Sequence, residues 1–217
     1  TLLVALRLVL LGSCALNFRI ITGENAALGS QPQVYLQGSN DLHICGGSLI
    51  SQSWVVIAAA CCISHGLGKL EQTASTGLAQ VLSILQAVTH PSWNLANNLM
   101  PLKLTLLAHY TTQISPVSLV SLEVWLATCT TKGWSHLRGR ASRGQVVCWG
   151  SRSASWTCAG GSGTTSCQGD SGRSLVYQMG DTSVFSGVVS GTSKCVCAPA
   201  VYTWVSKFHT WIKQVIT

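Results

Sequence analysis

Residues 167–172, Cys-Gln-Gly-Asp-Ser-Gly, are the part of the 217-residue sequence best suited to chemistry. A serine flanked by glycines lets the backbone turn tightly and expose the hydroxyl, as a nucleophile requires. Gly169, two residues before Ser171, offers an unobstructed N–H. That N–H and the N–H of Ser171 could together stabilise a developing oxyanion. The segment therefore predicts acyl-transfer chemistry centred on Ser171.

Short runs of β-branched and aromatic residues, separated by Gly, Ser and Asn turn signals, predict the elements that position this motif. We expect strands within residues 33–36, 53–60, 81–88, 184–189 and 200–205. Beyond residue 205, apolar residues recur at three- and four-residue spacing, which predicts a C-terminal amphipathic helix. Many short strands without long helices between them indicate antiparallel barrels or a sandwich.

The composition favours a well-packed domain from an oxidising compartment. Apolar residues make up 47% and charged residues only 9% of the chain, which excludes a disordered protein. Ten cysteines point to disulfides. The net charge of +7 arises because the chain has only six acids, and not because it has many bases. The arginine-rich segment 138–152 could bind a polyanion, but a solvated loop is the simpler interpretation. We expect no nucleic-acid partner.

The N-terminal segment has the features of a secretory signal peptide. Leu2 to Leu11 is apolar apart from Arg7 and is followed by Gly-Ser-Cys-Ala. Ten residues fall well short of the ~20 that span a bilayer. We therefore expect residues 1–15 to be a signal peptide and the protein to be secreted, extracellular and free of membrane attachment. A buried strand of the mature fold is the alternative.

Three further segments accompany the serine motif in a fixed order. Residues 19–24 read Arg-Ile-Ile-Thr-Gly-Glu, residues 45–61 run from Cys-Gly-Gly-Ser to Ala-Ala-Ala-Cys, and residues 199–203 read Pro-Ala-Val-Tyr-Thr. With these motifs the chain resembles the trypsin/chymotrypsin family of serine proteases, its chymotrypsin-like branch most closely, over about residues 18–217. The resemblance implies an all-β fold of two packed antiparallel barrels with a C-terminal helix. It also implies a site in the cleft between the barrels.

The same resemblance implies a zymogen. Residues 16–19 would form a short activation segment, and residues 20–217 the protease domain. Cleavage after Arg19 would free the amine of Ile20, which would pair with Asp170. Ser171 matches the nucleophile and Gly169 the oxyanion glycine.

Two of the three members of the catalytic triad do not match. The family's base is the histidine just before the second cysteine of the first-barrel disulfide, and Ala60 stands there. Its orienting aspartate follows a pair of asparagines, where the chain has Leu99 in a segment shortened by one residue and without an acid. A serine without an adjacent base is a weak nucleophile. His65 is the alternative base.

The pocket that would select the substrate also differs from the family pattern. Thr165 stands at the position that sets primary specificity, which favours apolar or aromatic side chains over basic ones. Ser190 and Gly191 remain from the pocket wall, without its tryptophan. Arg173 replaces a glycine after the nucleophile. We expect its side chain to be exposed and the turn to be perturbed.

By resemblance, the disulfides are Cys45–Cys61, Cys148–Cys158 and Cys167–Cys195. Tyr177 stands where the partner of Cys129 would be, and Ser118 where that of Cys14 would be. Four cysteines are thus unassigned: Cys14, Cys62, Cys129 and Cys197. Unassigned cysteines in a secreted chain carry a risk of disulfide-linked aggregation of an otherwise monomeric protein. The segment between Trp134 and Cys148 is short, which predicts a missing strand and an incomplete second barrel.

These residues predict a secreted, catalytically inactive homologue of a serine endopeptidase. Two alternatives remain: a weakly active endopeptidase with apolar or aromatic preference, and a decoy that binds peptides, protein substrates or protease inhibitors. We expect no cofactor and no metal.

Overall fold

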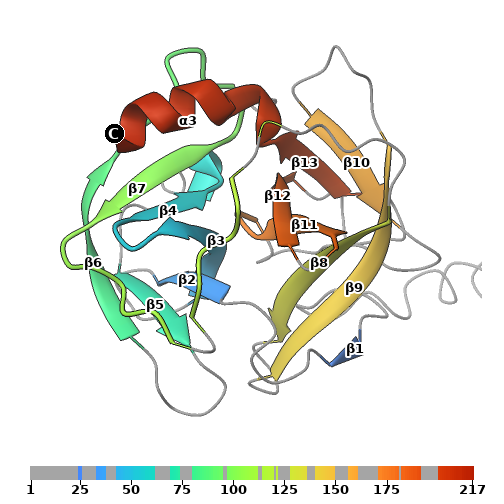
Figure 1. Cartoon of the computed structure of the whole chain (residues 1–217), viewed down its shortest axis with the longest axis horizontal. Helices are drawn as coiled ribbons and strands as arrows, with labels where there is room; N and C mark the ends of the chain where they lie inside the picture. Colours follow the sequence, from blue (N-terminus) through green and yellow to red (C-terminus); the bar gives the residue numbers. More distant parts are fainter. Residues whose placement is uncertain are drawn as a thin grey trace, which may run out of the picture.

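The computed structural model describes residues 24–25, 33–37, 43–61, 69–73, 80–94, 97–111, 114–119, 121, 128–135, 140–149, 156–160, 171–180, 182–191 and 200–217. Two groups of strands lie side by side, and the C-terminal helix α3 crosses the top of the first group (Figure 1). In the described part of the chain, no helix is both long enough and apolar enough to cross a membrane.

The first group is a closed barrel, with strand order β2-β3-β4-β7-β6-β5. Its strands are β2 (Gln33–Gln37), β3 (His43–Ser51), β4 (Trp54–Ile57), β5 (Lys69–Thr73), β6 (Gln80–Ala87) and β7 (Met100–Leu104). All neighbours in this barrel are antiparallel. Leu36, Ile57 and Leu102 are fully buried in its core. Close packing of the barrel therefore holds β3 and the residues after β4 rigidly in place.

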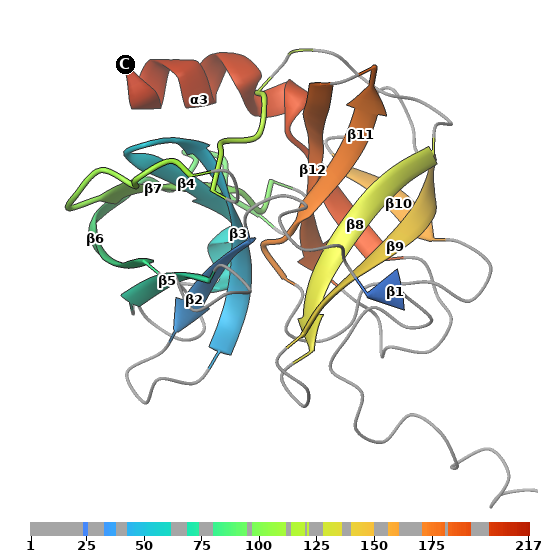
Figure 2. The same cartoon turned by 60° about the horizontal axis from the view of Figure 1, so that its bottom comes forward.

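The second group curls in the same way. Its strands are β1 (Glu24–Asn25), β8 (Thr128–Ser135), β9 (Arg140–Trp149), β10 (Trp156–Gly160), β11 (Ser174–Met179), β12 (Thr182–Gly191) and β13 (Ala200–Trp204). They form one sheet in the order β1-β9-β10-β13-β12-β11-β8, and β8 also pairs with β9. The strands from β8 to β13 therefore form a continuous ring of pairings (Figure 2).

The prediction of a missing strand between Trp134 and Cys148 is wrong. Strand β9 covers most of that segment and pairs with β8 over eight residue pairs, from Thr128↔Val147 to Ser135↔Arg140. Only residues 136–139 connect the two strands. The segment is short because its connection is short, and a long ladder of antiparallel hydrogen bonds is retained.

The segment 114–119 and the C-terminal helix tie the two barrels together. Val117 donates its N–H to the carbonyl of Leu49 on β3 at 2.9 Å, and Phe185 on β12 donates to the carbonyl of Ser118 at 3.1 Å. Helix α3 (His209–Ile216) follows β13 through a short 3-10 turn, η1 (Ser206–Phe208). The expected two-barrel fold with a C-terminal helix is thereby confirmed.

The helix comes from the second barrel but packs on the first. The imidazole of His90, which follows β6, meets the rings of Phe208 and Trp211 edge to face, with centroids 5.1 and 4.7 Å apart. Ile212 is fully buried in the core cluster that also contains first-barrel residues. This packing holds the two barrels together at one end of the junction.

Candidate active site

The turn that carries Ser171 lies at the junction of the two barrels. The carbonyl of Ser171 accepts a hydrogen bond from the N–H of Gly46 on β3, at 2.8 Å. The next N–H, of Gly172, donates to the carbonyl of Val189 on β12, also at 2.8 Å. The serine itself is partly exposed. Backbone contacts to both barrels thus fix the turn while Ser171 stays accessible.

Gly172 makes this close approach possible. Its φ of 86° lies in the left-handed region that residues with a Cβ rarely adopt. A Cβ there would lie 2.1 Å from the carbonyl oxygen of Gly46 and 3.2 Å from the backbone nitrogen of Ala58. The turn therefore lies directly against β3 and against the residues that follow β4.

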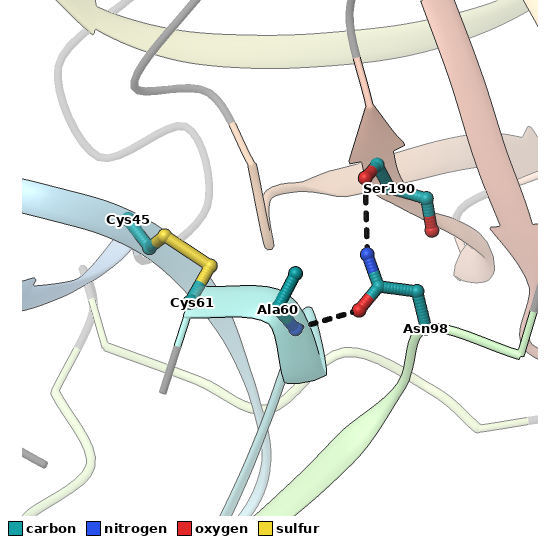
Figure 3. The surroundings of a disulfide bond; sticks show 5 residues. All are labelled: Cys45, Ala60, Cys61, Asn98 and Ser190. Carbon is teal, nitrogen blue, oxygen red and sulfur yellow. Dashed lines mark hydrogen bonds between the residues drawn. A yellow bond between two sulfur atoms is a disulfide. The ribbon is translucent and has the colours of Figure 1, made fainter. Parts of the chain in front are cut away.

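Ala60 lies in the short helical turn 59–61 that follows β4, one residue before Cys61, which is disulfide-bonded to Cys45 (Figure 3). The Cα atoms of the two cysteines are 6.2 Å apart. The N–H of Ala60 donates a hydrogen bond of 2.7 Å to the side-chain oxygen Oδ1 of Asn98. The alanine side chain is a methyl group, so this position offers no proton acceptor beyond its backbone.

Asn98 connects this turn to the second barrel. Its side chain is fully buried, and its Nδ2 donates to the carbonyl of Ser190 on β12 at 3.0 Å (Figure 3). The ladder between β12 and β13 shifts register between Val189 and Gly191, so a bulge falls at Ser190. The hydroxyl of Ser190 is hydrogen-bonded to that of Thr203. Asn98 is thus held between the two barrels at both ends of its amide.

The two hydrogen bonds determine what the amide of Asn98 can do. Oδ1 must accept from the N–H of Ala60, and Nδ2 must donate to the carbonyl of Ser190, so the orientation of the amide is fixed. The group is neutral, and a carboxylate here would set an acceptor against the Ser190 carbonyl. Within the described residues, Ala60 and Asn98 place neither a base nor an acid beside the serine turn.

Leu99, where we expected the acid to be replaced, is not part of this arrangement. Its side chain is fully buried in the hydrophobic core, and Asn98 is the residue that reaches Ala60 and Ser190. The sequence contained a signal that Asn98, and not Leu99, occupies the position of the acid. Because the segment is one residue short, counting from the asparagine pair leads to Leu99, whereas counting back from the following strand leads to Asn98.

Arg173 is buried, with only 3% of its surface accessible, whereas we expected its side chain to be exposed. A Cβ on Gly46 would lie 2.3 Å from its Cγ, so the side chain runs over the glycine of β3. Its backbone carbonyl accepts from the N–H of Val189 at 2.9 Å. The absence of a side chain on Gly46 gives Arg173 room between the barrels, and the turn keeps its contacts to both of them.

The structure tests one of the three predicted disulfides. The disulfide Cys45–Cys61 is present as expected. In the ladder between β9 and β10, Cys148 lies opposite Ala159, the residue after Cys158. Cys129 on β8 lies directly opposite Tyr177 on β11. Tyr177 thus stands across from the cysteine whose partner it was expected to replace.

Several predicted residues lie outside the described part of the chain: Arg19, Ile20, Thr165, Gly169, Asp170, Cys167, Cys195, His65, Cys14, Cys62 and Cys197. Residues 1–15, the expected signal peptide, and residues 16–19, the expected activation segment, also lie outside it. The described part brings together Ser171, Ala60 and Ser190, to which it adds Asn98 and Arg173.

Comparison with known proteins decides the family. The sequence profile described as Trypsin matches residues 20–212. The chain belongs to the trypsin family. This trypsin-family chain is 33% identical to Chymotrypsin-like elastase family member 1 of Canis lupus familiaris over 241 aligned positions, which cover 92% of the chain and 93% of the relative. The corresponding protein of Macaca fascicularis is 32% identical, with 92% and 90% covered.

A solved structure agrees with the fold of this trypsin-family chain. Mouse neuropsin, titled a serine protease expressed in the limbic system of mouse brain, superimposes with a TM-score of 0.76. The two sequences are 24% identical, and the match covers 91% of the chain and 100% of neuropsin. The likeness shows that the two-barrel architecture is shared.

Proposed function

We propose that this protein is a secreted member of the trypsin family that does not hydrolyse peptides. One observation carries the proposal: the segment that lies against the serine turn at Ala58 continues with Ala60, whose side chain is a methyl group and whose backbone is hydrogen-bonded to the neutral amide of Asn98. A working relay needs an imidazole that takes the serine proton and a carboxylate that orients and stabilises that imidazole. Neither group is supplied by these two residues.

The expected loss of rate is large. In well-studied serine proteases of this family, removing triad members leaves only about 10³- to 10⁴-fold acceleration over water, from the oxyanion hole and binding. Ser171 without a base stays in its poorly nucleophilic protonated form. A chain of this kind has no useful turnover, even if the N–H groups of Gly169 and Ser171 act as oxyanion donors.

What such a chain retains is the capacity to bind. The turn at Ser171 is tied to both barrels by backbone hydrogen bonds, so the backbone that would border a bound peptide is held in place. We propose that its partners are peptides, protein substrates or protease inhibitors, with Thr165, Ser190 and Gly191 forming a pocket for apolar or aromatic side chains. Activation by cleavage between Arg19 and Ile20, with Asp170 as the acceptor of the new amine, belongs to the same proposal.

Secretion rests on the N-terminal segment and on the cysteines. Cys45–Cys61 is one disulfide of the kind that oxidising compartments produce. We propose the further pairs Cys148–Cys158 and Cys167–Cys195, and a monomeric protein whose remaining cysteines can link chains.

A fluorophosphonate probe tests the proposed loss of catalysis. The chain is cut after Arg19 and exposed to the probe beside its Ser171→Ala variant and beside active chymotrypsin. We expect the two forms of the chain to be equally unlabelled while chymotrypsin is labelled. Labelling that disappears in Ser171→Ala would show an activated serine and would establish the alternative, a weakly active endopeptidase that uses another base.

A further inference from the structure

The segment that follows β7 carries two adjacent leucines that face solvent. The side chains of Leu106 and Leu107 are 68% and 66% exposed, the two highest values among the large apolar side chains that the structure describes. In both views the segment bends outward at the edge of the first barrel that lies away from the second barrel (Figures 1 and 2). Adjacent apolar side chains with this exposure are typical of an interaction surface.

Hydrogen bonds to β6 hold this segment at both ends. The N–H of Thr105 donates to the carbonyl of Ser83 at 3.0 Å. Further along, the N–H of His109 donates to Oε1 of Gln80 at 2.8 Å, and Nε2 of Gln80 donates back to the carbonyl of His109 at 2.8 Å. The two leucines lie between these attachments, so the fold itself holds them at the surface.

The outer face of β6 continues this apolar surface. Val81 lies between the two β6 residues that hold the segment and is 60% exposed. Leu85, further along the same strand, is 63% exposed. We call Val81, Leu85, Leu106 and Leu107 the apolar crest. Tyr110, directly beyond the segment, is also exposed, and a phenol suits the boundary between an apolar phase and water.

The charges beside the apolar crest favour a negatively charged partner. On one side of β6, strand β5 carries Lys69 and Glu71, and on the other side β7 carries Lys103. The sequence has no acid between Glu71 and Glu123, a range that contains the whole crest, and the net charge of the chain is +7. Negatively charged groups can therefore approach the crest with little opposing charge from the chain.

The outward course of the segment favours a fluid partner over a folded one. Leucines that protrude from the edge of a barrel need a matching cavity on a protein. The acyl chains of a bilayer close around such side chains without a preformed cavity. Tyrosine beside exposed leucines is also the combination that occurs at the membrane–water boundary.

We propose that the apolar crest docks the protein reversibly on membranes that contain anionic lipid. Leu106 and Leu107 enter the boundary of the acyl chains, and Tyr110 lies at the level of the headgroups. This peripheral binding goes beyond the proposed function. It also revises our expectation of no membrane attachment, which rested on the lack of an apolar run long enough to span a bilayer. Docking by this edge leaves the junction between the barrels, where Ser171 lies, away from the lipid.

Co-sedimentation with phosphatidylcholine vesicles, with and without phosphatidylserine, tests the proposal. All forms carry Cys14→Ser and are cut after Arg19, so that the apolar residues 2–11 are removed. We expect Leu106→Ser with Leu107→Ser to lower the partition coefficient on the phosphatidylserine vesicles by at least about 30-fold, because both leucines lose apolar area that would leave water. Raising the salt concentration, or omitting phosphatidylserine, should weaken binding of the natural chain by about tenfold.

Two control variants separate lipid insertion from other effects. Leu106→Met with Leu107→Met keeps apolar side chains and should retain the partition coefficient within about threefold. Met179→Ser removes an exposed apolar side chain from β11 in the second barrel and should change it by less than about twofold. Thermal unfolding should place every variant within about 2 °C of the natural chain, since all the substituted side chains are exposed. If the double serine variant does not fold, Leu106→Ser alone decides, with an expected loss of about fivefold.

Three results would overturn the proposal. The first is a natural chain that sediments with neither kind of vesicle. The second is equal binding by the natural chain and the double serine variant. The third is self-association that the double serine variant abolishes, without binding to vesicles, which would show that a second copy covers the crest. Because no readout involves hydrolysis, these results stand apart from the test of the proposed function.

Discussion

The side-chain oxygen of Asn98 accepts a 2.7 Å hydrogen bond from the backbone N–H of Ala60, across 38 residues of sequence. The other end of the same amide donates to the carbonyl of Ser190 in the second barrel at 3.0 Å. One buried neutral side chain thus joins the turn after β4 to β12, beside the serine turn. This arrangement acts as a structural tie between the barrels and is not suited to orient a charged imidazole.

Replacing Asn98 by aspartate should destabilise the protein. The change loses the bond to Ser190, sets two acceptors against each other and buries a negative charge, for a cost of about 3 kcal/mol at neutral pH. Urea unfolding measures this cost. At low pH the penalty should shrink, because a protonated carboxyl group can donate to the Ser190 carbonyl as the amide does.

Asn97 provides the matched control for that change. It is less buried, and its amide donates to the carbonyl of Ser92 at 2.9 Å at the surface. Asn97→Asp removes a similar hydrogen bond where water can replace it, so we expect a cost within about 1 kcal/mol. Equal costs at the two positions would show that Asn98 is not a buried tie.

Gly172 should tolerate no side chain. Gly172→Ala adds a Cβ that would lie 2.1 Å from the carbonyl oxygen of Gly46, at a φ of 86°. We expect a loss of more than about 3 kcal/mol, because both the backbone strain and the clash with β3 must be relieved by moving the serine turn.

Gly180 separates these two contributions. It also has a positive φ, 57°, but a Cβ there meets nothing within 4 Å. Gly180→Ala should therefore cost only about 1 kcal/mol, the price of the backbone conformation alone. If both variants unfolded at the same urea concentration, close packing of Gly172 against β3 would be refuted.

A cysteine at position 177 should form a disulfide with Cys129. Tyr177 lies directly opposite Cys129 in the β8–β11 ladder, and opposite residues of antiparallel strands have Cα atoms within the range that a disulfide spans. Tyr177→Cys should form the bond without reagent and stabilise the fold by up to about 4 kcal/mol, as expected for a loop of this length.

Mass spectrometry under non-reducing conditions would identify the 129–177 crosslink, and reduction should remove the gain in stability. Finding position 177 free, or linked to a second chain, would contradict the register assigned to these strands.

Local sequence patterns predicted the architecture well where strands are short and bounded by turns. The expected strands at 33–36, 81–88 and 200–205 coincide with β2, β6 and β13. The Cys45–Cys61 bond was expected from the family resemblance, which also marked Ala60, the residue before the second of these cysteines. Strand patterns depend on residues that are neighbours along the sequence, so a single sequence is enough to predict them.

The features that were missed depend on contacts far apart in sequence. Asn98 acquires its role from Ala60 and from Ser190, 92 residues away. Arg173 is buried only because Gly46 on another barrel leaves room for it. The strand β9 was overlooked because its connection to β8 is short, although the ladder between the two strands is long. Such partners become visible only when the strands are paired in three dimensions.

The most direct test compares the natural chain with a repaired one. Ala60→His with Asn98→Asp restores a base and an acid beside Ser171, and both chains are cut after Arg19 and given a peptide substrate with an aromatic residue before the scissile bond. We predict that kcat/KM of the repaired chain exceeds that of the natural chain by at least about 10³-fold, and that Ser171→Ala abolishes the gain. Turnover by the natural chain that depends on Ser171 and matches the repaired chain would contradict the account.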